Sequence, residues 1–129
     1  MSKVETNIDM KTNKKHFETF KKECEYWIKR FQLNGWKVEY VHAKLEDEVL
    51  GTLESNLDGY VALITFTTNI FDNGSDTTLE ENIRETAKHE VIHLLLSRLS
   101  LMGKTRFTES KGYISAEEEL VRKLEKIID

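Results

Sequence analysis

The sequence contains no proline and only one cysteine, and no long run of apolar residues occurs in it. No stretch approaches the roughly 18 consecutive apolar residues that a membrane-spanning helix requires, so we expect no association with a membrane. Cys24 has no second cysteine with which to form an internal disulfide, which is typical of a reducing compartment. The first residues, MSKVETNIDMKTNKK, lack the apolar core of a secretory signal. Together these absences predict a cytoplasmic protein.

A concentrated positive charge is also missing. The 19 lysines and arginines are interleaved with 23 acidic residues, which gives a net charge of −4. No basic block of the kind that nucleic-acid binding usually needs is present, so we expect no nucleic-acid partner. With 129 residues, of which 39% are apolar and 33% charged, the chain is typical of one soluble globular domain.

The spacing of apolar residues predicts a small α+β domain. A stripe at intervals of three and four predicts a helix over residues 14–31; it consists of Phe17, Phe20, Cys24, Trp27, Ile28 and Phe31. Alternation predicts three strands, over residues 36–45, 49–57 and 60–68, and Asp58-Gly59 predicts a hairpin between the last two. We expect these strands to form a small, mainly antiparallel sheet.

The second half of the sequence predicts two helices. Residues 68–78 are expected to form a loop, and the helix that follows runs to about Met102, where Gly103 can end it. A polar connection leads to a last helix over residues 116–128, which a capping box of Ser115 and Glu118 would begin.

The first of these two helices contains the motif HExxH, formed by His89, Glu90 and His93 within an apolar run. Residues four apart lie on one face of a helix, about 6 Å apart at their Cβ atoms, so two imidazoles can converge on one Zn²⁺ at about 2.0–2.1 Å. Glu90 can then hold and deprotonate a metal-bound water. The alternative is a metal-free helix with two hydrogen-bonded histidines and a glutamate that faces solvent.

A catalytic zinc usually has three protein ligands, so one more is expected. Glu117 is our first choice because it begins the buried stripe of the last helix, with Val121, Leu124 and Ile128. Glu118 is its main rival, although the capping box already uses it, and Glu109 is a more remote candidate. Glu119 faces solvent in this interpretation.

Three further residues of types that can bind metal, His16, His42 and Cys24, are expected to have no role at the site. His16 begins the first helix and His42 lies late in a strand, so both are expected to be surface or half-buried histidines. Cys24 falls on the apolar stripe of the first helix and is expected to be a small buried side chain.

The stretches HEVIHLLLSRL and AEEELVRKLE resemble the gluzincin branch of the zincin metallopeptidases, and more closely the short zincin-like metallopeptidases of phages and prophages. The likeness covers residues 15–128 in the order of elements. It implies one zincin-like domain over residues 13–129 behind a flexible N-terminus, residues 1–12, in the cytoplasm of a bacterium that carries or is infected by a phage. It also implies zinc held by His89, His93 and Glu117, with Glu90 as general base. Tyr113 is a candidate for stabilising the transition state.

The predicted function is therefore a zinc-dependent metalloendopeptidase that hydrolyses a peptide or protein substrate. In zincins, the strand before the active-site helix lies at the edge of the cleft, which here is the strand over residues 60–68, and an extended substrate could pair with it. One alternative is a catalytically silent zinc-binding protein, regulatory or peptide-binding, on the same scaffold. The other is a zinc-free α+β interaction domain.

Overall fold

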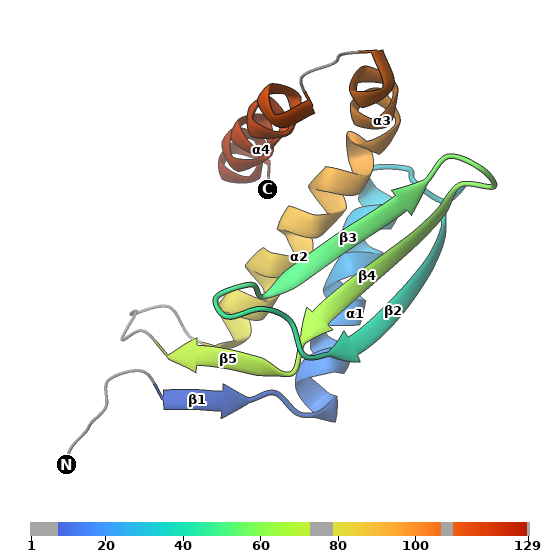
Figure 1. The fold of residues 1–129 in the computed structure, drawn as a ribbon. Coiled ribbons are helices and arrows are strands. Elements are labelled where there is room, and N and C mark those ends of the chain that lie inside the picture. The colour runs from blue at the N-terminus through green and yellow to red at the C-terminus, as the bar shows by residue number, and fades with distance from the viewer. Residues whose placement is uncertain (1–7, 73–78, 107–109, 129) are drawn as a thin grey trace.

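The computed structural model describes residues 8–72, 79–106 and 110–128. Within these residues the chain forms four helices, which are α1 (Lys14–Arg30), α2 (Leu79–Leu95), α3 (Ser97–Arg106) and α4 (Ser110–Ile127). It also forms five strands, which are β1 (Ile8–Lys11), β2 (Lys37–Ala43), β3 (Gly51–Asn56), β4 (Val61–Thr67) and β5 (Asn69–Asp72). The predicted α+β class is confirmed (Figure 1).

The larger sheet has three strands in the order β2-β4-β3. Strand β4 pairs in parallel with β2, from Lys37↔Val61 to Ala43↔Thr67, and antiparallel with β3. The sheet is therefore mixed, and the expected mainly antiparallel character is not confirmed. Because β4 is the strand most buried on both faces, it occupies the centre, and β2 pairs with it rather than with its neighbour in sequence. The hairpin between β3 and β4 is confirmed, and Gly59 within it has a φ of +78°.

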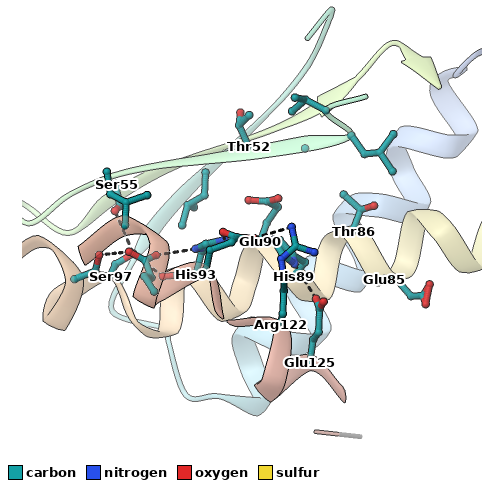
Figure 2. A pocket seen from close by; sticks show the side chains of 18 of the residues that line it. Thr52, Ser55, Glu85, Thr86, His89, Glu90, His93, Ser97, Arg122 and Glu125 are labelled. Carbon is teal, nitrogen blue, oxygen red and sulfur yellow. Dashed lines mark hydrogen bonds and ion pairs between the residues drawn. The ribbon is translucent and has the colours of Figure 1, made fainter. Parts of the chain in front are cut away.

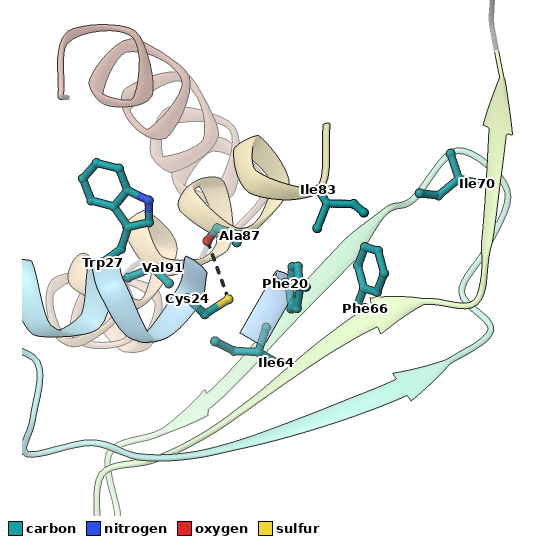
Figure 3. Close-up of a cluster of buried hydrophobic side chains, with 9 residues drawn as sticks. All are labelled: Phe20, Cys24, Trp27, Ile64, Phe66, Ile70, Ile83, Ala87 and Val91. Carbon is teal, nitrogen blue, oxygen red and sulfur yellow. Dashed lines mark hydrogen bonds between the residues drawn. The ribbon is translucent and has the colours of Figure 1, made fainter. Parts of the chain in front are cut away.

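The core lies between the sheet and the two helices α1 and α2, which cover one of its faces (Figure 1). Helix α1 contributes Phe20, Cys24 and Trp27 from the predicted stripe (Figure 3). Phe20 stacks on Phe66 of β4 with ring centroids 4.7 Å apart. Asn13 caps α1 and accepts a hydrogen bond from the backbone N–H of His16. The amphipathic helix predicted from this stripe is thus confirmed.

The helix predicted to reach Met102 is two helices, α2 and α3, which meet at Leu96. At this break the hydroxyl of Ser97 donates a hydrogen bond of 3.0 Å to the carbonyl of His93, one turn earlier. Such bonds compete with the helical ladder and bend helices. Helix α3 continues through Gly103, so the prediction that this glycine ends a helix is wrong.

Helix α4 begins at Ser110, earlier than the predicted start at residue 116. Ser115 therefore lies inside the helix and cannot cap it, so the predicted capping box with Glu118 is wrong. This correction matters for the site, because it removes the role that had been assigned to Glu118.

The segment before α1 forms part of a second, two-stranded sheet. Strand β1, in a segment expected to be flexible, pairs antiparallel with β5, which lies in a segment expected to be a loop. The hydroxyl of Thr12 donates to the carbonyl of Thr67 and accepts a hydrogen bond from Nε2 of His42 at 2.6 Å. These contacts fix the segment before α1 against the larger sheet.

Helix α2 runs past the edge strand β3 on one side and contacts α4 on the other (Figure 1). The middle of α2 thus lies between β3 and α4. Among the described residues, no helix has the length and apolar character needed to cross a membrane.

Candidate metal centre

His89, Glu90 and His93 lie in the middle of α2, at the bottom of a cleft of about 760 Å³ between β3 and α4 (Figure 2). The two imidazole rings are neighbours on one helical face, with centroids 4.9 Å apart. Both are partly buried, because 20% of the His89 side chain and 17% of the His93 side chain remain exposed. The pairing of two imidazoles that HExxH predicts on a helix is present.

The Nε2 atoms of both rings face the same carboxylate. Oε1 of Glu118 lies 3.1 Å from Nε2 of His89, and Oε2 of Glu118 lies 3.0 Å from Nε2 of His93. One ligand atom from each of these three residues lies within 4.8 Å of the other two. His89, His93 and Glu118 therefore form a group that could hold a metal ion.

The Nδ1 atoms of the same rings face two other carboxylates of α4. Oε2 of Glu125 lies 2.8 Å from Nδ1 of His89, and Oε2 of Glu117 lies 2.7 Å from Nδ1 of His93. The second oxygen of Glu117 accepts a hydrogen bond from the hydroxyl of Ser100. Each imidazole thus lies between two carboxylates, one at each ring nitrogen.

This arrangement contains more acceptors than neutral histidines can satisfy. A neutral imidazole carries one N–H, so a ring that donates from Nδ1 presents a lone pair at Nε2. In that state the lone pairs of His89 and His93 point at the oxygens of Glu118, which is repulsive. A cation between the two rings and the carboxylate would remove this repulsion. Two imidazole nitrogens and one carboxylate oxygen are a donor set that suits zinc.

Glu90 lies beside the histidines and is 6% exposed. Burial, more than any neighbouring charge, raises the pKa of this carboxyl above its ordinary value; the two histidines act in the opposite direction. Among the described residues, none donates a hydrogen bond to it. A buried carboxylate without such a donor is costly unless a positive charge lies near it.

Gly51 of β3 lies directly over Glu90. A Cβ atom at this position would lie 3.0 Å from Cγ2 of Thr86 and 3.4 Å from Cγ of Glu90. Any side chain on Gly51 would therefore press on α2 at the site. The absence of a side chain lets β3 approach the helix closely and cover the base of Glu90.

The structure brings His89, Glu90 and His93 together, as expected. Glu117, our first choice for the third ligand, contacts Nδ1 of His93, while Glu118 faces both Nε2 atoms. The assignment of Glu117 as a metal ligand stays a prediction.

Glu125 is a further residue of the site that was not predicted from the sequence. Its signal was its spacing, since it follows Glu118 by seven residues, or two helical turns on one face.

The other candidates lie elsewhere. His16 belongs to the cap of α1, His42 contacts Thr12, and Cys24 is buried in the core, as expected for a small apolar side chain. Glu109 and the side chain of Tyr113 lie outside the part of the molecule that the structure describes.

The strand at the edge of the cleft differs from the expectation. Strand β4, over residues 61–67, is paired on both sides and cannot accept an added strand. Strand β3 lines the cleft instead, through Gly51, Thr52, Leu53 and Ser55.

No protein-family model matches the chain, and neither the curated proteins nor the solved structures include a significant match to it, so its chemistry has to be inferred from the site itself.

Proposed function

We propose that this protein is a zinc-dependent peptidase in which His89, His93 and Glu118 hold the metal ion and Glu90 is the general base. One observation carries the proposal: two Nε2 atoms meet one carboxylate at 3.1 and 3.0 Å, while both Nδ1 atoms are already engaged. Three protein ligands are typical of catalytic zinc sites, which keep another position for water or substrate. The buried Glu90 beside them supports a catalytic role, because a structural site needs no such carboxylate.

The reaction assigned to these residues is hydrolysis of a peptide bond. When bound, zinc supplies Lewis acidity, which polarises a carbonyl and lowers the pKa of a nearby water. The carboxylate of Glu90 accepts a proton from the attacking water as the water oxygen bonds to the carbonyl carbon. Glu90 then donates this proton to the amide nitrogen as the C–N bond breaks, which restores the carboxylate.

The edge strand β3 supports a peptide as the substrate. It borders the cleft, and within the described residues it pairs with β4 alone. An extended peptide can therefore add to its open edge through backbone hydrogen bonds, next to the site. The zincin-like interpretation of the fold and the cytoplasmic location belong to this same proposal.

The metal content of the purified protein tests the site. We expect one zinc per chain by elemental mass spectrometry, and its loss in His93→Ala and Glu118→Ala. Glu119→Ala is the matched control, because Glu119 lies on α4 but is 70% exposed and paired with Lys123. A wild-type protein that binds no divalent metal would overturn the proposal and favour a metal-free interaction domain.

The variant Glu90→Gln tests the chemistry. We expect it to keep zinc and to lose hydrolysis of unfolded proteins and peptides by about 10²–10⁴-fold, the usual contribution of a general base. Unchanged turnover would exclude Glu90 as the base. Zinc binding without any hydrolysis by the wild-type protein would instead support the alternative, a catalytically silent zinc-binding protein.

A further inference from the structure

We infer that Glu117 and Glu125 are positioning residues, each of which holds one imidazole in the orientation that directs its Nε2 atom at Glu118. The inference rests on the proposed metal site and concerns how the chain prepares its ligands. Its basis is that three acidic residues of α4 contact different nitrogen atoms of the two imidazoles. Glu118 faces both Nε2 atoms, whereas Glu117 and Glu125 each face one Nδ1 atom.

Glu125 is held in place by one contact of its side chain and one of its backbone. Its side chain meets Nδ1 of His89 at 2.8 Å, and its backbone carbonyl accepts a hydrogen bond of 2.9 Å from Nζ of Lys88. The same ammonium donates to the carbonyl of Ile128 and lies 5.0 Å from the ring centroid of Trp27. Lys88 precedes His89 in sequence, so α2 holds the end of α4 beside the histidine that Glu125 contacts.

Glu117 is fixed through both of its carboxylate oxygens. One oxygen lies 2.7 Å from Nδ1 of His93, and the other accepts a hydrogen bond from the hydroxyl of Ser100 on α3. Ser100 is 4% exposed, and 14% of the Glu117 side chain is exposed. A carboxylate held at both oxygens has little freedom to turn toward the cleft, so its direction matches a role at Nδ1.

The chemical consequence is a fixed tautomer. A carboxylate that accepts the Nδ1–H leaves the lone pair on Nε2, fixes the plane of the ring and raises its basicity as a ligand. Removal of such a partner typically costs about 10–100-fold in metal affinity. Glu117 and Glu125 should therefore matter for zinc binding although neither faces the Nε2 atoms.

Competition between the protein and a chromophoric chelator for Zn²⁺ measures this contribution. We expect Glu117→Ala and Glu125→Ala each to bind zinc about 10–100-fold more weakly than the wild type. The glutamine variants should lose less, because an amide oxygen still accepts the Nδ1–H. Glu119→Ala should match the wild type, since this residue is on the solvent face of the same helix.

Nitrogen NMR of the histidine side chains in the zinc-loaded protein separates positioning from a general structural effect. We expect a protonated Nδ1 in both rings of the wild type. Glu125→Ala should change the signals of His89 alone, and Glu117→Ala those of His93 alone. Circular dichroism should show that each variant keeps the helical content of the wild type.

A milder variant, Ser100→Ala, tests the inference even if Glu117→Ala does not fold. Ser100→Ala keeps the carboxylate but removes the hydroxyl that orients it, so we expect a smaller change confined to His93. If both alanine variants bind zinc as tightly as the wild type, the inference is wrong but the proposed function is not affected. The inference is also wrong if the NMR signals of both rings change together in either variant. A wild-type protein that binds no zinc would overturn the proposed function and this inference with it.

Discussion

Replacement of Gly51 by alanine tests how closely β3 lies over α2, the helix that carries His89, Glu90 and His93. The new methyl carbon would lie 3.0 Å from Cγ2 of Thr86, 3.3 Å from the carbonyl oxygen of Thr65 and 3.4 Å from Cγ of Glu90. The first distance is tighter than nearly all contacts of real Cβ atoms, so the side chain of Thr86, or β3 relative to α2, must shift by a few tenths of an ångström. We expect this shift to lower the stability of the fold and to disturb Glu90, whose Cγ is also in contact with the new methyl carbon.

The magnitude follows from two opposing terms. Overpacking costs about 1–3 kcal/mol, and the smaller backbone entropy of alanine in the unfolded chain offsets about 0.5–1 kcal/mol of this. We therefore expect the free energy of unfolding to fall by about 1 kcal/mol. With an unfolding entropy of about 2.1 cal/mol/K for each of the 129 residues, the melting temperature should fall by about 4 °C.

Calorimetry of four proteins provides the test, namely the wild type, Gly51→Ala, Gly35→Ala and the double variant Gly51→Ala with Thr86→Ser. Gly35→Ala is the control, because a Cβ atom there has no heavy atom within 4 Å. Thr86→Ser removes the clashing methyl but keeps the hydroxyl that donates to Asn82, so the double variant should recover most of the loss. Equal melting temperatures for both glycine variants, or no recovery in the double variant, would refute the reasoning.

Three further predictions concern the core and the docking of α4. Cys24 is fully buried and burial raises the pKa of its thiol, so little thiolate forms at neutral pH; mass spectrometry should show slow alkylation by iodoacetamide until the protein is denatured. Rapid alkylation of the native protein would contradict this burial. Phe66→Ala removes a fully buried ring and should lower the free energy of unfolding by about 3–5 kcal/mol in urea titrations, whereas Tyr26→Ala on the exposed face of α1 should cost far less. Lys88→Met removes the ammonium that donates to the last turn of α4 and should cost about 1.5–3 kcal/mol. Hydrogen exchange should then accelerate in α4 but not in α1, and an equal acceleration in both helices would argue against local docking.

The parts of the structure that follow from local geometry could be predicted from the sequence. The helical period places His89 and His93 on one face whatever surrounds them, and the stripe of α1 identifies its buried residues for the same reason. The hairpin at Asp58-Gly59 is equally local. These features need only the spacing of neighbouring residues along one element.

The parts of the structure that depend on packing between elements could not be predicted from the sequence. The choice between Glu117 and Glu118 depended on where α4 begins, and Ser115 was read as a cap although the helix starts at Ser110. A capping signal spans four residues and is overridden when the helix packs on α2 and α3. The parallel pairing of β2 with β4 is similar, because alternation identifies strands but not their neighbours.

The residues around the candidate centre come from two helices that meet at a seam, with the imidazoles on α2 and three acids on α4. An ion that requires both sides stabilises the closed seam by its own binding free energy, so the ion and the docking of α4 are thermodynamically linked. The linkage acts in both directions. If the proposed site binds a metal ion, abundant metal would favour a docked C-terminal helix, and any partner that draws this helix away would lower the affinity for the ion.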